Sequence, residues 1–120
     1  MLELLSENEG NILGLKAQGT ITLEDFRQTL APCLAAVILD WGKARLLLYL
    51  EEDFDGFDLE AFKGEAAFGS KHRDNLEKVA VVGGSFMINL QIRFGAALLG
   101  GEVQTFASEE LEGAWDWLRS

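Results

Sequence analysis

The side chains best suited to chemistry are carboxylates that gather in one short stretch of the sequence. Residues 51–56 read Glu-Glu-Asp-Phe-Asp-Gly, which places oxygen ligands at the first, third and fifth positions of an EF-hand-like loop and glycine at the sixth. The register fails beyond that point, because Asp58 stands at an apolar position and Phe62 replaces the glutamate that closes the coordination shell. We interpret the stretch as a solvated acidic loop, with a weak surface cation site as the alternative, and predict no metal centre.

The sequence offers no group that would turn these carboxylates into a hydrolytic pair. The single cysteine, Cys33, falls in the apolar stripe of a predicted helix and is expected to be a small core residue. The single histidine, His72, lies between Lys71 and Arg73 in what we interpret as a solvated basic turn. Because no nucleophile, base and orienting group can be named together, we expect neither an enzyme nor a cofactor.

Composition and charge narrow the class of protein and its partners. The 120 residues are 48% hydrophobic and 25% charged, which fits a single domain over residues 1–120. Ten basic and twenty acidic residues give a net charge of −10, which disfavours nucleic acid as a partner. The N-terminus is acidic where an export signal is basic, and apolar runs such as 31–39 are shorter than the roughly 20 residues of a membrane-spanning helix. We expect a soluble, cytoplasmic protein with at most weak membrane contact.

Five short segments have the pattern of β-strands. Residues 2–7 and 12–17 flank a turn-forming Asn-Glu-Gly-Asn sequence and predict an N-terminal hairpin. The apolar runs 45–50 and 79–82 are typical of strands covered on both faces, and 102–106 is a weaker run of the same kind. Segments of helical length separate the later runs. We therefore expect an α/β fold with a mostly parallel, five-stranded sheet and the hairpin at its antiparallel edge.

The first of about four expected helices has clear signals at both ends. Thr22 and Asp25 have the spacing of a capping box, and apolar residues follow at three- and four-residue steps. Pro32 should kink or split this helix, because proline lacks the backbone donor that a helix interior needs. Gly42 is a natural end for it.

The remaining helices are predicted from length and position. They occupy roughly residues 58–73 and 85–99, and a closing helix opens at Ser108. Within the second of these, residues 88–94 alternate apolar and polar side chains, which is a strand signal and leaves a hairpin as the alternative. We favour helix there, because two buried parallel strands need a crossover between them.

Six segments, in this order and spacing, carry a resemblance to a known family. They are Gly19–Phe26, Lys43–Leu50, Lys71–His72, Val79–Gly83, Glu102–Phe106 and Glu109–Leu118. Together they span nearly the whole chain and resemble the SpoIIAA-like family of small bacterial proteins. The resemblance implies a STAS-like α/β fold, related to the CRAL-TRIO lipid-binding architecture, with helix rather than strand at 88–94.

For function, the resemblance implies two different activities. One is antagonism of an anti-sigma factor, as in STAS proteins, and the other is binding of nonpolar ligands with membrane association. In the STAS antagonists a phosphorylatable serine or threonine follows the third strand, where added charge switches partner binding. Here residues 51–69 contain no hydroxyl residue, and the next is Ser70. The acidic side chains are therefore either a permanently charged replacement for that switch or a plain solvated loop.

Aromatic residues cluster in the same region. Four of the eight phenylalanines fall within fifteen residues, interspersed with glycines. A helix that contains glycine depends on packing to stay in place, so it can lift from the sheet and open an apolar cleft. We expect this cleft to bind a nonpolar or amphipathic small molecule or lipid reversibly, and plain core packing is the alternative. The expected lining residues are Phe54, Phe57, Phe62, Phe68, Phe86 and Met87.

A protein partner is the competing hypothesis. Trp115 and Trp117 cannot both face the sheet, since residues two apart on a helix point about 200° apart. One should pack inward, and the other is left for a partner or a second copy of the chain in an isologous dimer. The residues expected at the partner surface, where a regulatory protein would bind, are Asp53, Asp55, Asp58 and Trp115.

Overall fold

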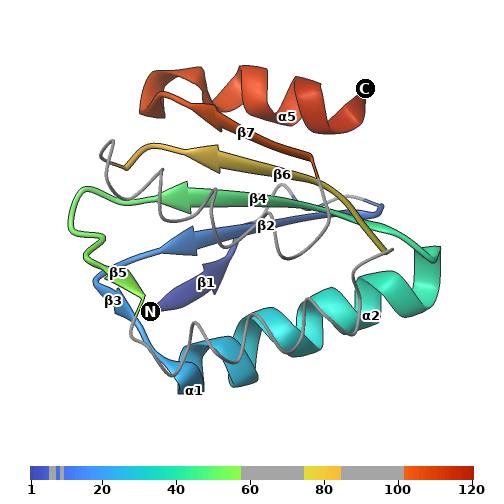
Figure 1. The fold of residues 1–120 in the computed structure, drawn as a ribbon, viewed down its shortest axis with the longest axis horizontal. Coiled ribbons are helices and arrows are strands. Elements are labelled where there is room, and N and C mark those ends of the chain that lie inside the picture. Colours follow the sequence, from blue (N-terminus) through green and yellow to red (C-terminus); the bar gives the residue numbers. More distant parts are fainter. Residues whose placement is uncertain (6–7, 9, 58–74, 85–101) are drawn as a thin grey trace.

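The computed structural model describes residues 1–5, 8, 10–57, 75–84 and 102–120. Their strands form a five-stranded sheet with helices on both faces, and a two-stranded ribbon lies at one end (Figure 1). The five strands of the main sheet are β1 (Leu2–Leu4), β2 (Ile12–Ala17), β4 (Ala44–Leu50), β6 (Leu76–Val82) and β7 (Glu102–Phe106). The α/β class and the mixed five-stranded sheet expected from the sequence are confirmed.

The sheet has the order β1-β2-β4-β6-β7. Strand β1 is antiparallel to β2, with Leu2 opposite Ala17, and the other neighbouring pairs are parallel. The predicted hairpin at the antiparallel edge is therefore confirmed. The predicted run 79–82 begins earlier than expected, at Leu76, because the charged pair Glu77 and Lys78 interrupts the apolar pattern without ending the strand.

The central strands bury side chains on both faces of the sheet. One face carries the larger cluster, in which Leu46, Leu48 and Val81 pack beneath the first helical region. The other face carries a smaller cluster, in which Leu47 and Val82 pack beneath the last helix. Continuous apolar runs belong to strands of this kind, since every residue of such a strand meets a covering layer.

The first helical region is divided as the sequence predicts. Helix α1 (Leu23–Asp25) continues into the π-helical segment η1 (Phe26–Leu30) and then into α2 (Ala31–Trp41). Pro32 lies in the first turn of α2, directly after the wider π-helical segment, so the regular α-helix is interrupted just before the residue that lacks a backbone donor. Gly42 ends the helix at φ 80°, and its N–H donates to the carbonyl of Ile38 at 2.7 Å.

The last helix is short and sits close to the sheet. A 3-10 turn, η3 (Ser108–Glu110), leads into α5 (Leu111–Arg119), and the side chain of Glu110 accepts a bond from the N–H of Ala107 at 2.8 Å. Trp115 of α5 packs directly over Gly14 of β2. A β-carbon at Gly14 would lie 2.7 Å from Cη2 of Trp115, so glycine is the residue that allows this approach.

The number of helices needs correction. About four were expected, whereas the part of the chain that the structure describes has two helical regions, α1–η1–α2 and η3–α5. The segments 58–73 and 85–99, which include the alternating run 88–94, lie outside the described residues. In the described ranges, no helix is both long enough and apolar enough to cross a bilayer.

The predicted capping box at the start of α1 is confirmed. The N–H of Asp25 donates to Oγ1 of Thr22 at 3.2 Å, and the N–H of Thr22 donates to Oδ2 of Asp25 at 3.0 Å. The terminal ammonium of Met1 lies 3.6 Å from the same carboxylate oxygen and donates to the carbonyl of Gln18 at 2.6 Å. Partial burial alone would raise the pKa of Asp25, but the hydrogen bonds from Thr22 and the ammonium outweigh it, and the pKa lies below its ordinary value.

Asp25→Asn is expected to lower the free energy of unfolding by about 1 kcal/mol at neutral pH, because it removes the charged partner of the capping box. A carboxyl whose pKa is depressed by folding contributes stability that is present above its unfolded pKa and is lost as the pH falls through the folded pKa. The difference between the variant and the parent should therefore shrink below about pH 4. Urea denaturation across a pH series measures it, with the exposed Asp40→Asn as the control. A difference that stays constant down to strongly acidic pH would contradict this role.

Candidate functional site

The acidic stretch after β4 is a loop whose backbone is fixed at several points. The N–H of Glu51 donates to the carbonyl of Ala17 at 3.0 Å, that of Phe54 to Glu51 at 3.0 Å, and that of Asp55 to Gly19 at 2.9 Å. The loop is therefore tied to the end of β2 rather than extended into solvent. This acidic loop, residues 51–55, is the first candidate surface.

The acidic loop has one buried residue, Phe54, between exposed carboxylates. Asp53 and Asp55, expected at a partner surface, are exposed together with Glu52. Phe54 between them is only 7% exposed and belongs to the larger core cluster. Lys16 lies 3.9 Å from Glu51 and 3.4 Å from Glu3, so the first carboxylate of the loop has a nearby cation. The loop thus presents carboxylates outward while a buried phenyl ring holds it in place.

A short ribbon that the sequence did not reveal continues this arrangement. Strand β3 (Thr20–Ile21) pairs in parallel with β5 (Gly56–Phe57), directly after the acidic loop. Strands of two residues carry no periodic signal in a sequence, so nothing in the pattern could have predicted them. The ribbon fixes the end of the loop just as the bond to Ala17 fixes its start.

The structure describes only part of the predicted apolar pocket. Phe54 of the acidic loop lies in the larger core cluster, and the backbone of Phe57 belongs to β5. The other predicted lining residues, Phe62, Phe68, Phe86 and Met87, lie outside the described residues, as does Asp58 of the predicted partner surface. The pocket therefore stays a prediction.

The prediction for Trp115 is wrong. Its side chain is 4% exposed and packs with Ala114 and Leu118 against the sheet, so it is not available to a partner. Trp117 is the half-buried tryptophan, and its ring lies 6.0 Å from that of Phe106 on β7. The helical spacing shows that the two indoles point in different directions. The space over Gly14 decides that Trp115 is the one that faces the sheet.

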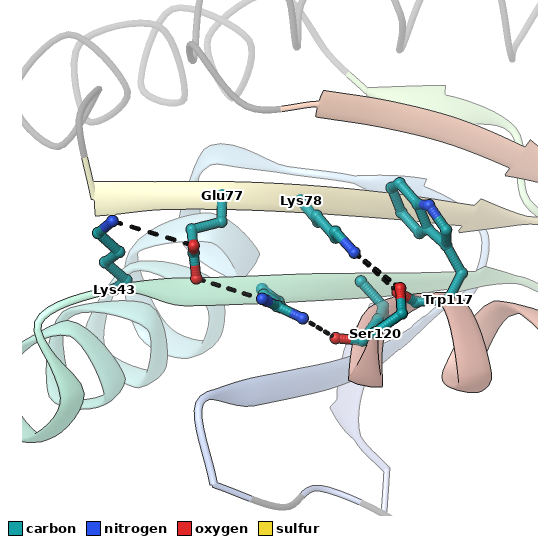
Figure 2. Close-up of polar contacts among 7 residues, drawn as sticks. Lys43, Glu77, Lys78, Trp117 and Ser120 are labelled. Atoms are coloured by element: carbon teal, nitrogen blue, oxygen red, sulfur yellow. Dashed lines mark hydrogen bonds and ion pairs between the residues drawn. The ribbon is translucent and has the colours of Figure 1, made fainter.

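A second group of charged residues gathers at the C-terminal end of α5, as Figure 2 shows. Arg45 on β4 donates from Nε to Oε1 of Glu77 at 3.4 Å and from Nη1 to the carbonyl of Leu118. Lys43 lies 4.0 Å from the other oxygen of Glu77. Arg45 is thereby oriented by a carboxylate on the neighbouring strand while it binds the last turn of the helix.

Lys78 on β6 makes similar contacts with the last turn of α5. Its Nζ donates to the carbonyl of Trp117 and to Oγ of Ser120, both at 3.0 Å, and it lies 5.0 Å from the centroid of the Trp117 ring (Figure 2). Cations at the C-terminus of a helix satisfy its free carbonyls and offset its dipole. We call Arg45 and Lys78 the helix anchor, and we interpret their charges as structural.

The contacts of the helix anchor were not predicted from the sequence. Both cations stand near the start of apolar strands, at positions where one would expect solvent-exposed ends. The sequence does show a charged side chain near the start of each apolar run. Such a side chain needs a polar partner when it is buried, but the sequence pattern does not show which element supplies that partner.

An open depression of about 470 Å³ lies beside the helix anchor. Its lining residues are Gly10, Asn11, Ile12, Arg45, Leu118 and Arg119. Arg45 is engaged by Glu77 and Leu118, and Arg119 lies 3.3 Å from Asp116. The depression therefore adds no distinct set of groups for binding or catalysis.

The one cysteine of the chain, Cys33, lies among the described residues. Cys33 is half-buried and packs against the larger core cluster, as expected of a small core residue. Across the ranges that the structure describes, no three His, Cys, Asp or Glu residues are grouped as metal ligands would be. His72 lies outside those ranges.

Comparison with known proteins identifies a family and finds similar solved structures. Residues 12–119 match the family model described as SpoIIAA-like. Among solved structures, an uncharacterized protein from the DUF3478 family, with a SpoIIAA-like fold and from Shewanella loihica PV-4, is similar with a TM-score of 0.73 and 27% sequence identity. The similarity covers 98% of this chain and 93% of that chain. No curated protein matches.

Proposed function

Because this chain belongs to the SpoIIAA-like family, we propose that it is a non-enzymatic, cytoplasmic binding module that contacts a regulatory protein through the acidic loop at residues 51–55. The observation that carries the proposal is the combination of a fixed backbone and outward carboxylates in that loop. Phe54 is buried, whereas Asp53 and Asp55 on either side of it are exposed.

Preorganisation is the physical reason that this loop suits recognition. A loop that is already fixed loses little conformational entropy when a partner binds, so more of the contact energy remains as affinity. Hydrogen bonds to Ala17 and Gly19 and the ribbon of β3 and β5 hold this loop before any partner arrives. Exposed carboxylates on it attract a basic surface and set the orientation of the encounter.

The position of the loop supports the same proposal. It directly follows β4, and the resemblance to STAS antagonists places their phosphorylatable residue after the corresponding strand. The carboxylates supply at this position the negative charge that phosphorylation adds in those proteins. We therefore propose that the acidic loop binds a basic partner surface constitutively, without control by phosphorylation.

Asp53→Lys combined with Asp55→Lys is expected to abolish retention of the partner, because it turns an attractive surface into a repulsive one. Tagged parent and variant are used to capture proteins from the host lysate at low and high salt, and the retained proteins are identified by mass spectrometry. The parent should retain a basic protein in a salt-sensitive manner.

The matched control is Asp40→Lys combined with Asp116→Lys. It makes the same change of charge at exposed positions near the C-terminal ends of α2 and α5, where a cation is favourable. The control should retain the partner. Circular dichroism checks that both double variants are folded. Equal retention by the loop variant and the parent would refute the role of the acidic loop.

Binding of a nonpolar or amphipathic small molecule is the second candidate function. It is favoured by Phe54, which enters the larger core cluster from the first position of the phenylalanine-rich segment 54–68. Because this segment starts against the apolar face of the sheet, that face offers an apolar surface on which such a ligand would bind.

Native mass spectrometry of the protein purified from its own host tests this second function. A near-stoichiometric adduct that organic extraction identifies as a lipid or quinone-like molecule is the expected result. Phe62→Asp should abolish the adduct, because a carboxylate does not enter an apolar pocket, and circular dichroism must show that the variant is folded. A protein without an adduct would leave the partner-binding function as the only one proposed.

A further inference from the structure

Strand β7 ends the main sheet on the side opposite the hairpin (Figure 1). Its inner edge is fully used, since all five of its residues pair with β6, from Lys78 opposite Glu102 to Val82 opposite Phe106. Within the ranges that the structure describes, no strand pairs with its outer edge. The outer edge therefore presents a row of backbone groups to whatever lies beside it.

The backbone groups on that outer edge can be identified. The N–H of Gly83 donates to the carbonyl of Phe106 at 2.9 Å, so the main-chain groups of Phe106 face β6. Because these groups alternate in direction along a strand, those of Glu102 and Gln104 also face β6. The N–H and C=O groups of Val103 and Thr105 then face outward.

The sequence of β7 does not protect this edge. Edge strands are normally shielded by lysine, by proline, by a bulge or by being very short. Strand β7 has regular pairing over five residues, and its Val, Thr and Phe side chains favour β-structure. The other edge, β1, has only three residues, whereas β7 has five. Among the residues that the structure describes, this contrast singles out β7 as the edge available for pairing.

We propose that β7 pairs antiparallel with β7 of a second copy of the chain, with the two-fold axis at Gln104. In this register Val103 lies opposite the second copy's Thr105, and Thr105 lies opposite its Val103. Both are outward-facing positions, and opposed residues of this kind in an antiparallel pair exchange two hydrogen bonds. The register thus uses every outward backbone group of the two residues, giving four bonds between the chains, and the two five-stranded sheets become one.

Charge and side-chain placement favour the same arrangement. Glu102 is the charged residue of β7, and in this register it lies opposite the second copy's Phe106 rather than opposite another glutamate. Parallel pairing in register would place the two glutamates together, which is unfavourable. A two-fold axis perpendicular to the sheet keeps both α5 helices on the same face. The half-buried Trp117, packed on Phe106, then lies close to the new seam.

Gln104 provides the sharpest test, because it is exposed in the single chain and would face itself across the axis. Gln104→Lys and Gln104→Glu each place like charges opposite one another and are expected to raise the dimer dissociation constant about tenfold or more. An equimolar mixture of the two variants should form a heterodimer that is tighter than either homodimer. Sedimentation velocity over a concentration series measures the masses and constants. The matched control is Gln28→Lys, an exposed position on η1, which should dimerise like the parent.

A second variant keeps the test independent of side-chain charge. Thr105→Pro removes an outward donor and no bond to β6, so the chain should fold and remain a monomer. A parent that stays monomeric at every concentration would overturn the proposal, even if its β7 edge then binds an extended peptide from another protein. A dimer whose dissociation constant is unchanged in Gln104→Lys would overturn it as well. Failure here leaves the contact through the acidic loop unaffected, because the two surfaces share no residue.

Discussion

The close packing of Trp115 on Gly14 is the contact on which the arrangement of this molecule depends. The central strands are apolar on both faces, so each face needs a cover, and on one of them the described cover is α5 with nine residues. A helix this short is marginal in isolation and is held by tertiary packing. The bare backbone at Gly14 lets the indole lie against β2, where a β-carbon would come within 2.7 Å of it. The helix anchor, Arg45 and Lys78, then fixes the C-terminal end of the helix through the carbonyls of Leu118 and Trp117.

The same constraint decides which surfaces remain for recognition. Once Trp115 is buried and the cations of the helix anchor are engaged with backbone carbonyls, the face beneath α5 has little polar chemistry to offer. The outward carboxylates of the acidic loop and the outer edge of β7 lie elsewhere, on segments set in place by the sheet. Both are the surfaces that we propose for contact with another molecule.

Local signals in the sequence predicted much of the fold, and long-range packing accounts for what they missed. The capping box of Thr22 and Asp25 and the end at Gly42 depend on residues a few positions apart, and both are confirmed. Runs of apolar residues placed the strands, although β6 begins before its charged pair and the ribbon of β3 and β5 gave no signal. The inward direction of Trp115 depends on a glycine a hundred positions away, which no local pattern contains. The partners of Arg45 and Lys78 were hidden for the same reason.

Two glycine-to-alanine substitutions, compared by urea denaturation, test the central contact most directly. Gly14→Ala should lower the free energy of unfolding by about 1–3 kcal/mol, because the new methyl group would lie 2.7 Å from Trp115 and 2.9 Å from Oδ1 of Asn8, and both must shift. Gly113→Ala, on the exposed side of α5 where nothing lies within 4 Å of a β-carbon, should instead raise it by about 0.5–1 kcal/mol through helix propensity. A Gly14→Ala protein as stable as the parent would contradict the account.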